Sequence, residues 1–132
     1  MVEAVDGSLL ESTRETLIIP GIAFERQLIN STSEYLHVLE GLNIEPPILL
    51  FLTLIGVKGY SIAFVAPDRI EVPVPGTIDT IERDLLLIPE IVIESYDVAV
   101  SEAMKPCFDS VSNASGLSRS LSYNDKGKWS PQ

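Results

Sequence analysis

The chain has only one cysteine, Cys107, and only one histidine, His37, among its 132 residues. A single thiol excludes an intramolecular disulfide and any metal site that is built from several thiolates. The N-terminus carries Glu3 and Asp6 where a secretory signal would need basic residues before an apolar stretch. Both observations favour a reducing compartment, and we therefore expect a cytoplasmic protein.

Long apolar runs and basic residues are also scarce. The most apolar stretch, residues 48–55, ends at Gly56, whereas a membrane-spanning helix needs about 20 apolar residues. Nine lysines and arginines stand against 19 acids, which gives a formal net charge of −10. This charge disfavours a broad nucleic-acid surface and an anionic membrane as partners. Hydrophobic residues make up 45% of the chain, which is enough for one globular core.

The first half of the chain predicts an extended segment, a helix and a strand. Residues 17–19 are suited to tie the N-terminus to a sheet edge. A helix is predicted over residues 22–40, with Gly41 as the residue that ends it. Residues 48–55 are apolar on both alternating faces, which predicts a strand covered on two sides, by the N-terminal segment or by a partner. The helix places its apolar residues on one stripe: Phe24, Leu28, Ile29, Tyr35, Leu36 and Leu39.

Turn signals divide the next part of the chain into short strands. Residues 56–59 predict a hairpin turn, with the returning strand at 60–65. Pro73 lacks a backbone donor, so residues 70–74 should lie at an edge or a bulge. A short helical turn is expected at 78–82. Two further strands are expected at 85–88 and 90–94.

A second helix should begin near Val98, with Asp97 as its N-cap, and should end at Gly116. Pro106 should kink or restart it. The fold class is therefore α+β in two layers: a mostly antiparallel sheet of three to five strands with a helix near each end of the chain. The predicted organisation is an extended segment (1–19), an α+β core domain (20–116) and a C-terminal tail (117–132) docked by Trp129.

No group of residues predicts a catalytic site. His37 lies off the apolar stripe, which indicates a solvated side chain, and Cys107 beside Phe108 indicates a small buried hydrophobe. Nucleophilic catalysis would need these groups within hydrogen-bond reach of a partner. The glycines at 56 and 59 lie between two strands, whereas a phosphate-binding loop joins a strand to a helix. We therefore expect no catalytic residue, cofactor or metal.

Two alternatives stay open at this point. The tail combines bases with aromatic residues, as single-strand nucleic-acid binders do, but its net charge is only +2, which leaves −12 for the rest of the −10 chain. Docking of the tail onto the core is therefore preferred. An acidic metal-dependent phosphoesterase would instead gather hard cations between carboxylates, for which the candidates are Asp79, Glu82, Asp84, Glu90, Glu94 and Asp97.

Phrases spread over residues 22–129 resemble the C-terminal region of a family of bacterial proteins. In that family, the N-terminal part carries a Schlafen-like, Alba-type DNA-binding domain, often labelled ATP-binding. The resemblance implies a companion domain from which the DNA-binding domain is absent, so it transfers no catalytic role. One departure is Ser112, where an aromatic residue is usual. The similar stretches are Phe24-Glu25, Tyr35-Leu36, Pro46-Pro47, 52–60, Arg83-Asp84, 87–90, 105–109, 113–116, Arg119-Ser120, 123–125 and 127–129.

The sequence thus predicts a non-enzymatic accessory or interaction module. Its expected partner is another protein or a second copy of the chain, with no membrane, and this segment alone is not expected to bind nucleic acid. The strand at 48–55 and the tail would make the contact. The candidate interaction residues are Phe51, Tyr60, Arg119, Tyr123, Lys128 and Trp129.

Overall fold

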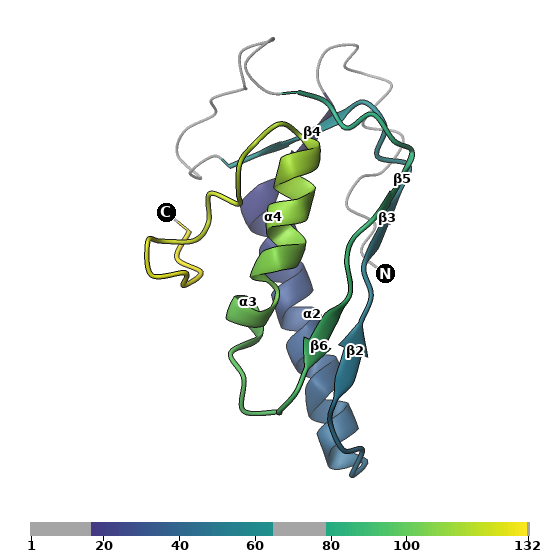
Figure 1. Ribbon diagram of the computed structural model, residues 1–132, viewed down its shortest axis with the longest axis vertical. Helices are drawn as coiled ribbons and strands as arrows, with labels where there is room; N and C mark the ends of the chain where they lie inside the picture. The colour runs from purple at the N-terminus through teal and green to yellow at the C-terminus, as the bar shows by residue number, and fades with distance from the viewer. Residues whose placement is uncertain (1–16, 65–78, 132) are drawn as a thin grey trace.

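The computed structural model describes residues 17–64 and 79–131, and it confirms the α+β class (Figure 1). Of the predicted segments, residues 1–16 and 70–74 lie outside this range. None of the helices in the described parts of the chain is long and apolar enough to cross a membrane. The elements in chain order are β1 (Leu17–Pro20), α2 (Gly21–Gly41), β2 (Ile48–Leu50), β3 (Thr53–Ile55), β4 (Tyr60–Ala63), β5 (Leu85–Leu87), β6 (Ile91–Ile93), α3 (Val100–Ala103) and α4 (Lys105–Ala114).

The strands form three two-stranded ladders. β1 pairs with β4 in parallel, β2 pairs with β6 in antiparallel orientation, and β3 pairs with β5 in the same way. The last two ladders follow each other along the same two stretches of chain, so they make one long ribbon, residues 48–55 against 85–93. Between the ladders, residues 51–52 lie opposite residues 88–90, so the second stretch has one residue more, and the Ile88 N–H donates to Leu52 O at 3.1 Å. Pro89 lies in this irregular stretch. A residue without an N–H is tolerated where the ladder is interrupted.

The predicted hairpin between residues 48–55 and 60–65 is wrong. The first strand pairs with residues 85–93, and β4 pairs with β1. Gly56 and Gly59 adopt φ values of 73° and 88°, which are left-handed conformations that glycine reaches without steric cost. They turn the chain away from the ribbon and into β4. The segment therefore connects two different pairs of strands.

The helical turn predicted at 78–82 is also wrong for residues 79–82. Ile81 instead bridges the free side of β4: its N–H donates to Tyr60 O at 2.7 Å, and its carbonyl accepts from Gly59 N at 2.8 Å. Ile81 is 1% exposed. The segment that begins at residue 79 is thus extended. Its hydrogen bonds to Gly59 and Tyr60 place it alongside β4, on the side away from β1.

The helix predicted at 22–40 is confirmed as α2, with two corrections. Tyr35 is 65% exposed and lies outside the core, whereas Phe24 and Leu36 are buried as expected. The left-handed residue after the helix is Asn43, with φ 60°, and Gly41 still belongs to the helix. Tyr35 lies about 100° around the helix from the buried Leu36, at the edge of the face that packs on the core.

The second helical region begins later than predicted. Asp97 caps no helix, since α3 starts at Val100 with Ala99 as its N-cap residue. Pro106 restarts the helix as expected, because it occupies the first turn of α4, where its missing N–H costs nothing. Gly116, with φ 82°, follows the end of α4 as predicted.

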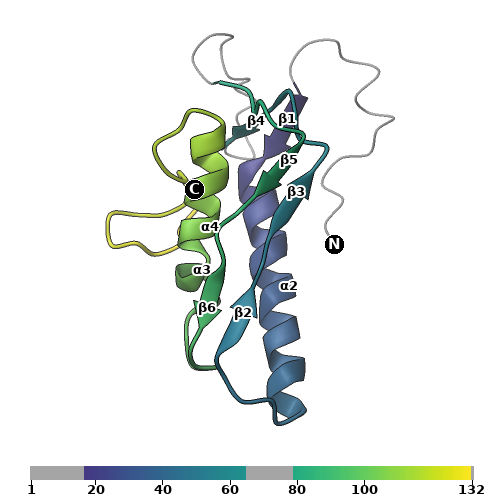
Figure 2. The ribbon, with the colours of Figure 1, turned by 45° about the vertical axis from the view of Figure 1, so that its right-hand side comes forward.

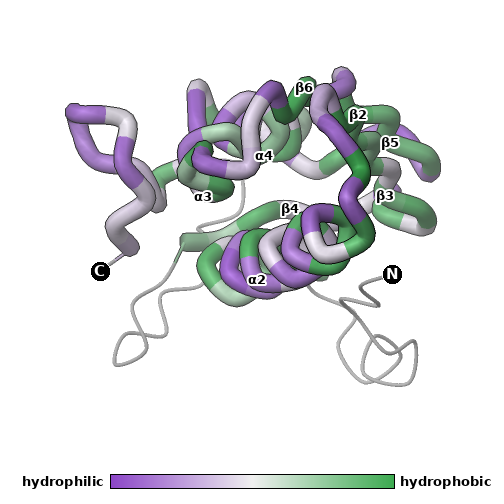
Figure 3. Tube along the Cα trace, turned by 90° about the horizontal axis from the view of Figure 1, so that it is seen from below, coloured by the Kyte–Doolittle hydropathy of each residue, from purple (hydrophilic) through white to green (hydrophobic). Residues whose placement is uncertain are grey.

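The core lies between α2, α4 and the inner face of the ribbon. Figures 2 and 3 show the ribbon beside both helices, which face each other. The rings of Phe24 and Phe108 meet edge to face, with centroids 6.2 Å apart and planes at 68°. Phe108, Ile62 and Val111 are 0% exposed. The two helices and the ribbon therefore depend on one shared core.

Gly116 is a position where a side chain would be costly. A Cβ atom there would lie 2.9 Å from Asp79 Oδ2 and 3.2 Å from Asp79 Cβ, whereas a Cβ at Gly127, with φ 74°, would meet nothing within 4 Å. We expect Gly116→Ala to lower the free energy of unfolding by about 2 kcal/mol and Gly127→Ala by about 1 kcal/mol. Positive φ is strained for alanine at both positions, and the contact with Asp79 adds to the loss at position 116. Urea titration of both variants measures the difference. Equal losses would show that Asp79 moves aside freely.

Candidate functional site

The outer face of the ribbon is apolar and open to solvent. On the first strand, Leu49, Phe51 and Ile55 are 52%, 67% and 72% exposed. On the second strand, Leu85, Leu87 and Val92 are 49%, 70% and 45% exposed. Alternate residues of a strand point to the same face, so Leu49, Phe51 and Ile55 share one side. The register places Val92 opposite Leu49 and Leu85 opposite Ile55, on that same side. Leu87 lies opposite Thr53, which belongs to the same alternating set. We call the exposed apolar side chains the apolar ribbon face: Leu49, Phe51, Ile55, Leu85, Leu87 and Val92.

The strand register makes the apolar ribbon face continuous. Leu49 lies opposite Val92, and Ile55 lies opposite Leu85, so each pair presents two apolar side chains side by side. The opposite face packs on the core, where Ile91 and Ile93 are 8% and 1% exposed. The sequence predicts cover on both faces of this strand. The structure covers one face and leaves the other accessible.

The size of the apolar ribbon face sets it apart from scattered surface hydrophobes. Its six side chains present on the order of 600 Å² of apolar surface, at the upper end of what a monomer usually exposes in one patch. The cross-strand pairs of the two ladders contain no charged residue, and Glu90 is exposed in the stretch between them. Figure 3 shows this concentration of hydrophobic residues along β2, β3 and β5. A surface of this kind can bind another apolar surface.

A second feature is a buried carboxyl group on α2. Glu25 is 0% exposed, and its two oxygens accept hydrogen bonds from the C-terminal tail. Ser120 Oγ donates to Glu25 Oε2 at 2.6 Å, and Trp129 Nε1 donates to Glu25 Oε1 at 3.2 Å. The guanidinium of Arg26 lies 5.5 Å from the centre of the Trp129 ring, within the range of a cation–π contact. We call Glu25, Ser120 and Trp129 the tail clasp.

Burial raises the pKa of Glu25 above its ordinary value of 4.5. The hydroxyl of Ser120 and the indole of Trp129 oppose part of this rise because their hydrogen bonds stabilise the carboxylate. The charge of Asp109 raises the pKa further. The carboxyl group of Glu25 therefore binds its proton more tightly than a solvated glutamate does. It is also enclosed by the surrounding protein, so it cannot contact a bound substrate.

The tail folds into a small hairpin-like loop that its own side chains hold. Asn124 Oδ1 accepts from the backbone N–H of Lys126 and of Lys128, both at 3.0 Å, and Tyr123 and Trp129 form an isolated β-bridge. Lys128 Nζ contacts Glu102 Oε1 at 2.9 Å. Trp129 packs against the core cluster, and its Nε1 donates to Glu25 Oε1.

The structure brings together few of the predicted interaction residues. Phe51 is exposed and belongs to the apolar ribbon face, whereas Tyr60 and Tyr123 are 5% and 3% exposed and cannot contact a partner in this structure. Lys128 is exposed on the tail, and so is Arg119, whose Nη1 donates to the Tyr123 carbonyl at 3.0 Å. Trp129 is half-buried in the tail clasp. Two aromatic rings that would stack on bases in a nucleic-acid complex therefore serve the core and the clasp.

The residues considered for catalysis are dispersed. His37 is exposed on α2. Cys107 is 1% exposed, and burial raises its pKa to about 11, so its thiol is neutral and unreactive at physiological pH. Within the described residues, no three His, Cys, Asp or Glu side chains converge as metal ligands would. The six acids of the phosphoesterase alternative are each exposed: Asp79, Glu82, Asp84, Glu90, Glu94 and Asp97.

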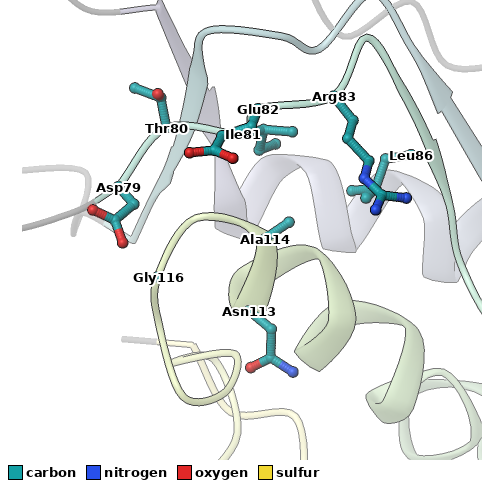
Figure 4. A pocket seen from close by; sticks show the side chains of 9 residues that line it. All are labelled: Asp79, Thr80, Ile81, Glu82, Arg83, Leu86, Asn113, Ala114 and Gly116. Carbon is teal, nitrogen blue, oxygen red and sulfur yellow. The ribbon is translucent and has the colours of Figure 1, made fainter.

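A hollow of about 330 Å³ lies between residues 79–86 and the end of α4 (Figure 4). Glu82, Arg83 and Asn113 line it, and all three are exposed. Specific small-molecule sites enclose most of the ligand and place a few polar groups inside an apolar cavity. This hollow has the opposite character, because its charged groups lie in solvent. It does not have the features of a ligand site.

Comparison with known proteins found no matching family model, no similar curated protein and no similar solved structure.

Sequence reasoning missed the main residues of both features. It singled out Phe51 on the ribbon, but not Ile55 or Leu87, because it treated the strand as buried on both sides. It grouped Glu25 with the polar positions of the helix. One signal was available: Glu25 lies eleven residues before Leu36, which is close to three turns, so both side chains share one face of α2. A carboxyl group on the buried face needs hydrogen-bond partners.

Proposed function

We propose that this chain is a non-enzymatic protein-interaction module that binds a protein partner through the apolar ribbon face. One observation carries the proposal: six large apolar side chains lie next to one another on one side of the ribbon, and each is at least 45% exposed. Burying that surface against a partner releases the water that covers it, which is the dominant favourable term in most protein associations.

The chemistry of the described residues supports binding more than catalysis. The buried carboxyl group of Glu25 is enclosed by the tail, the thiol of Cys107 lies in the core, and the exposed acids stand apart from one another. The resemblance to a companion region of bacterial DNA-binding proteins agrees with an accessory role, since a companion domain needs a surface for its neighbour. The proposal itself depends only on the ribbon.

The ribbon also has the properties of a fixed interface. Its inner face is anchored in the core by Ile91 and Ile93, and Phe108 and Val111 of α4 belong to the same cluster. The outer side chains therefore project from a supported backbone. Binding to a preorganised surface loses little conformational entropy. A partner would need an apolar patch of matching size, and charged contacts would be confined to the rim.

Site-specific photo-crosslinking tests the proposal. A benzophenone amino acid at position 87 should give a discrete crosslinked product in cells that make the chain, and the same probe at position 37, exposed on α2, should give none. The product from position 87 should disappear when Phe51→Ser is added, because that change removes apolar contact from the same face. Equal products from both positions, or none from position 87, would contradict the proposed function.

A further inference from the structure

We propose that the partner of the apolar ribbon face is a second copy of this chain, and that the faces of two copies pack together about a two-fold axis. This inference rests on the proposed function, because it assigns the partner of the same surface. It goes further in committing to one occupant, a symmetric homodimer.

The area of the face fits a dimer. Two faces that each contribute on the order of 600 Å² would bury about 1,200 Å² in total, which reaches the lower end of specific and stable interfaces. Two ribbons stacked face to face make the smallest complete sandwich, with about 10 Å between the layers.

The chemistry of the face favours a copy of itself over an oppositely charged partner. A two-fold interface sets one surface patch against the same patch of the other copy, so a charge near its centre would meet a like charge. The outward pairs Leu49–Val92, Thr53–Leu87 and Ile55–Leu85 contain no charge. A basic protein, by contrast, would complement the net charge of −10, but along the ribbon it would meet a single exposed carboxylate, that of Glu90 between the two ladders.

The charge at the rim gives the dimer a signature. Asp84 is exposed just before the second strand of the ribbon, Glu90 is exposed in the stretch between the two ladders, and each copy carries −10. Two copies therefore repel each other electrostatically. Salt screens this repulsion at separations beyond about 8 Å at physiological ionic strength. Added salt should strengthen the association of two copies, whereas it should weaken binding to a basic partner.

Sedimentation velocity of the full chain over a wide range of protein concentrations tests the inference. Wild type should reach twice the 14.4 kDa mass of the chain. Its dissociation constant should fall several-fold between about 50 and about 500 mM NaCl because repulsion is screened. Leu87→Lys should raise the dissociation constant at least tenfold, since it sets like charges face to face in a dry interface.

Two valines provide a matched comparison. Val92 lies in the apolar ribbon face and is 45% exposed, and Val38 lies on α2 and is 58% exposed. Val92→Lys should weaken the dimer as Leu87→Lys does, and Val38→Lys should leave it unchanged. Circular dichroism and a thermal melt establish that each variant folds. If a lysine variant on the ribbon does not fold, Phe51→Ser weakens the face without adding a charge.

Several outcomes would overturn the inference. A dimer that survives Leu87→Lys and is lost in Val38→Lys would use α2, and an association that weakens in salt would point to charged contacts. A wild-type monomer at every concentration would reject the second copy. Crosslinking from position 87 then separates the cases: a product with another protein keeps the proposed function, whereas a product with residues 1–16 of the same chain, or no product, rejects both.

Discussion

Replacing Phe108 with alanine should lower the free energy of unfolding by about 4 kcal/mol, the usual loss when a large aromatic side chain is removed from a core. Phe108 is 0% exposed, and its ring meets Phe24 edge to face. The substitution would leave a cavity between α2 and α4, the two helices that support the ribbon. Urea titration at low protein concentration, where the chain is a monomer, measures the loss.

Phe51→Ala is the matched control for this prediction. It removes the same atoms from a side chain that is 67% exposed, so the free energy of unfolding should change by about 0.5 kcal/mol or less. At the same time it should weaken association through the ribbon. If both variants lost similar stability, Phe51 would be buried in solution and the apolar ribbon face would not exist as described.

The second large effect is expected at the tail clasp. Glu25→Ala should cost about 3 kcal/mol at pH 5, because it removes the acceptor of the Ser120 hydroxyl and the Trp129 indole and leaves buried donors without partners. Hydrogen exchange should also become faster in residues 120–130. Glu34→Ala, at an exposed position of the same helix, should change stability by about 0.5 kcal/mol or less. A Glu25→Ala variant as stable as wild type would show that the clasp contributes nothing.

The pH dependence of Glu25→Gln isolates the titration of this carboxyl group. Burial raises the folded-state pKa above the ordinary 4.5, so the folded chain holds the proton more tightly than the unfolded chain. The resulting stabilisation is complete below about pH 4.5 and is lost as the pH rises through the raised pKa. The stability of wild type relative to Glu25→Gln should therefore fall from pH 4.5 to pH 8. A constant difference would mean that the pKa of Glu25 is not raised.

The parts of the fold that depend on local patterns could be predicted from the sequence. The spacing of Phe24, Leu28 and Leu36 predicts α2 to within one residue at each end, and Pro106 predicts the restart at α4. The start of the second helical region was predicted less accurately, because Asp97 suits an N-cap but α3 begins only at Val100. In the structure, the Asp97 N–H donates to Ser95 Oγ at 3.1 Å.

Strand pairing and the exposed face could not be predicted in the same way. Glycine at 56 and 59 is typical of a hairpin, and nothing local indicates that residues 48–55 pair with a segment more than 30 residues further on. Alternation also fails as a guide here, since a strand with both faces apolar gives the same sequence pattern whether the outer face is buried within the chain or left for a partner. Only the packing around Phe51 and Leu87 distinguishes these cases.

The tail clasp has a consequence for the order in which the chain becomes ordered during synthesis. Glu25 accepts hydrogen bonds from Ser120 and Trp129, which are 95 and 104 residues away. A ribosome makes the chain from its N-terminus at about 5–20 residues per second, so Glu25 emerges several seconds before its partners exist. Until then its carboxyl group has to stay hydrated. The first helix within the described residues, α2, is therefore among the last of these elements to reach its final environment.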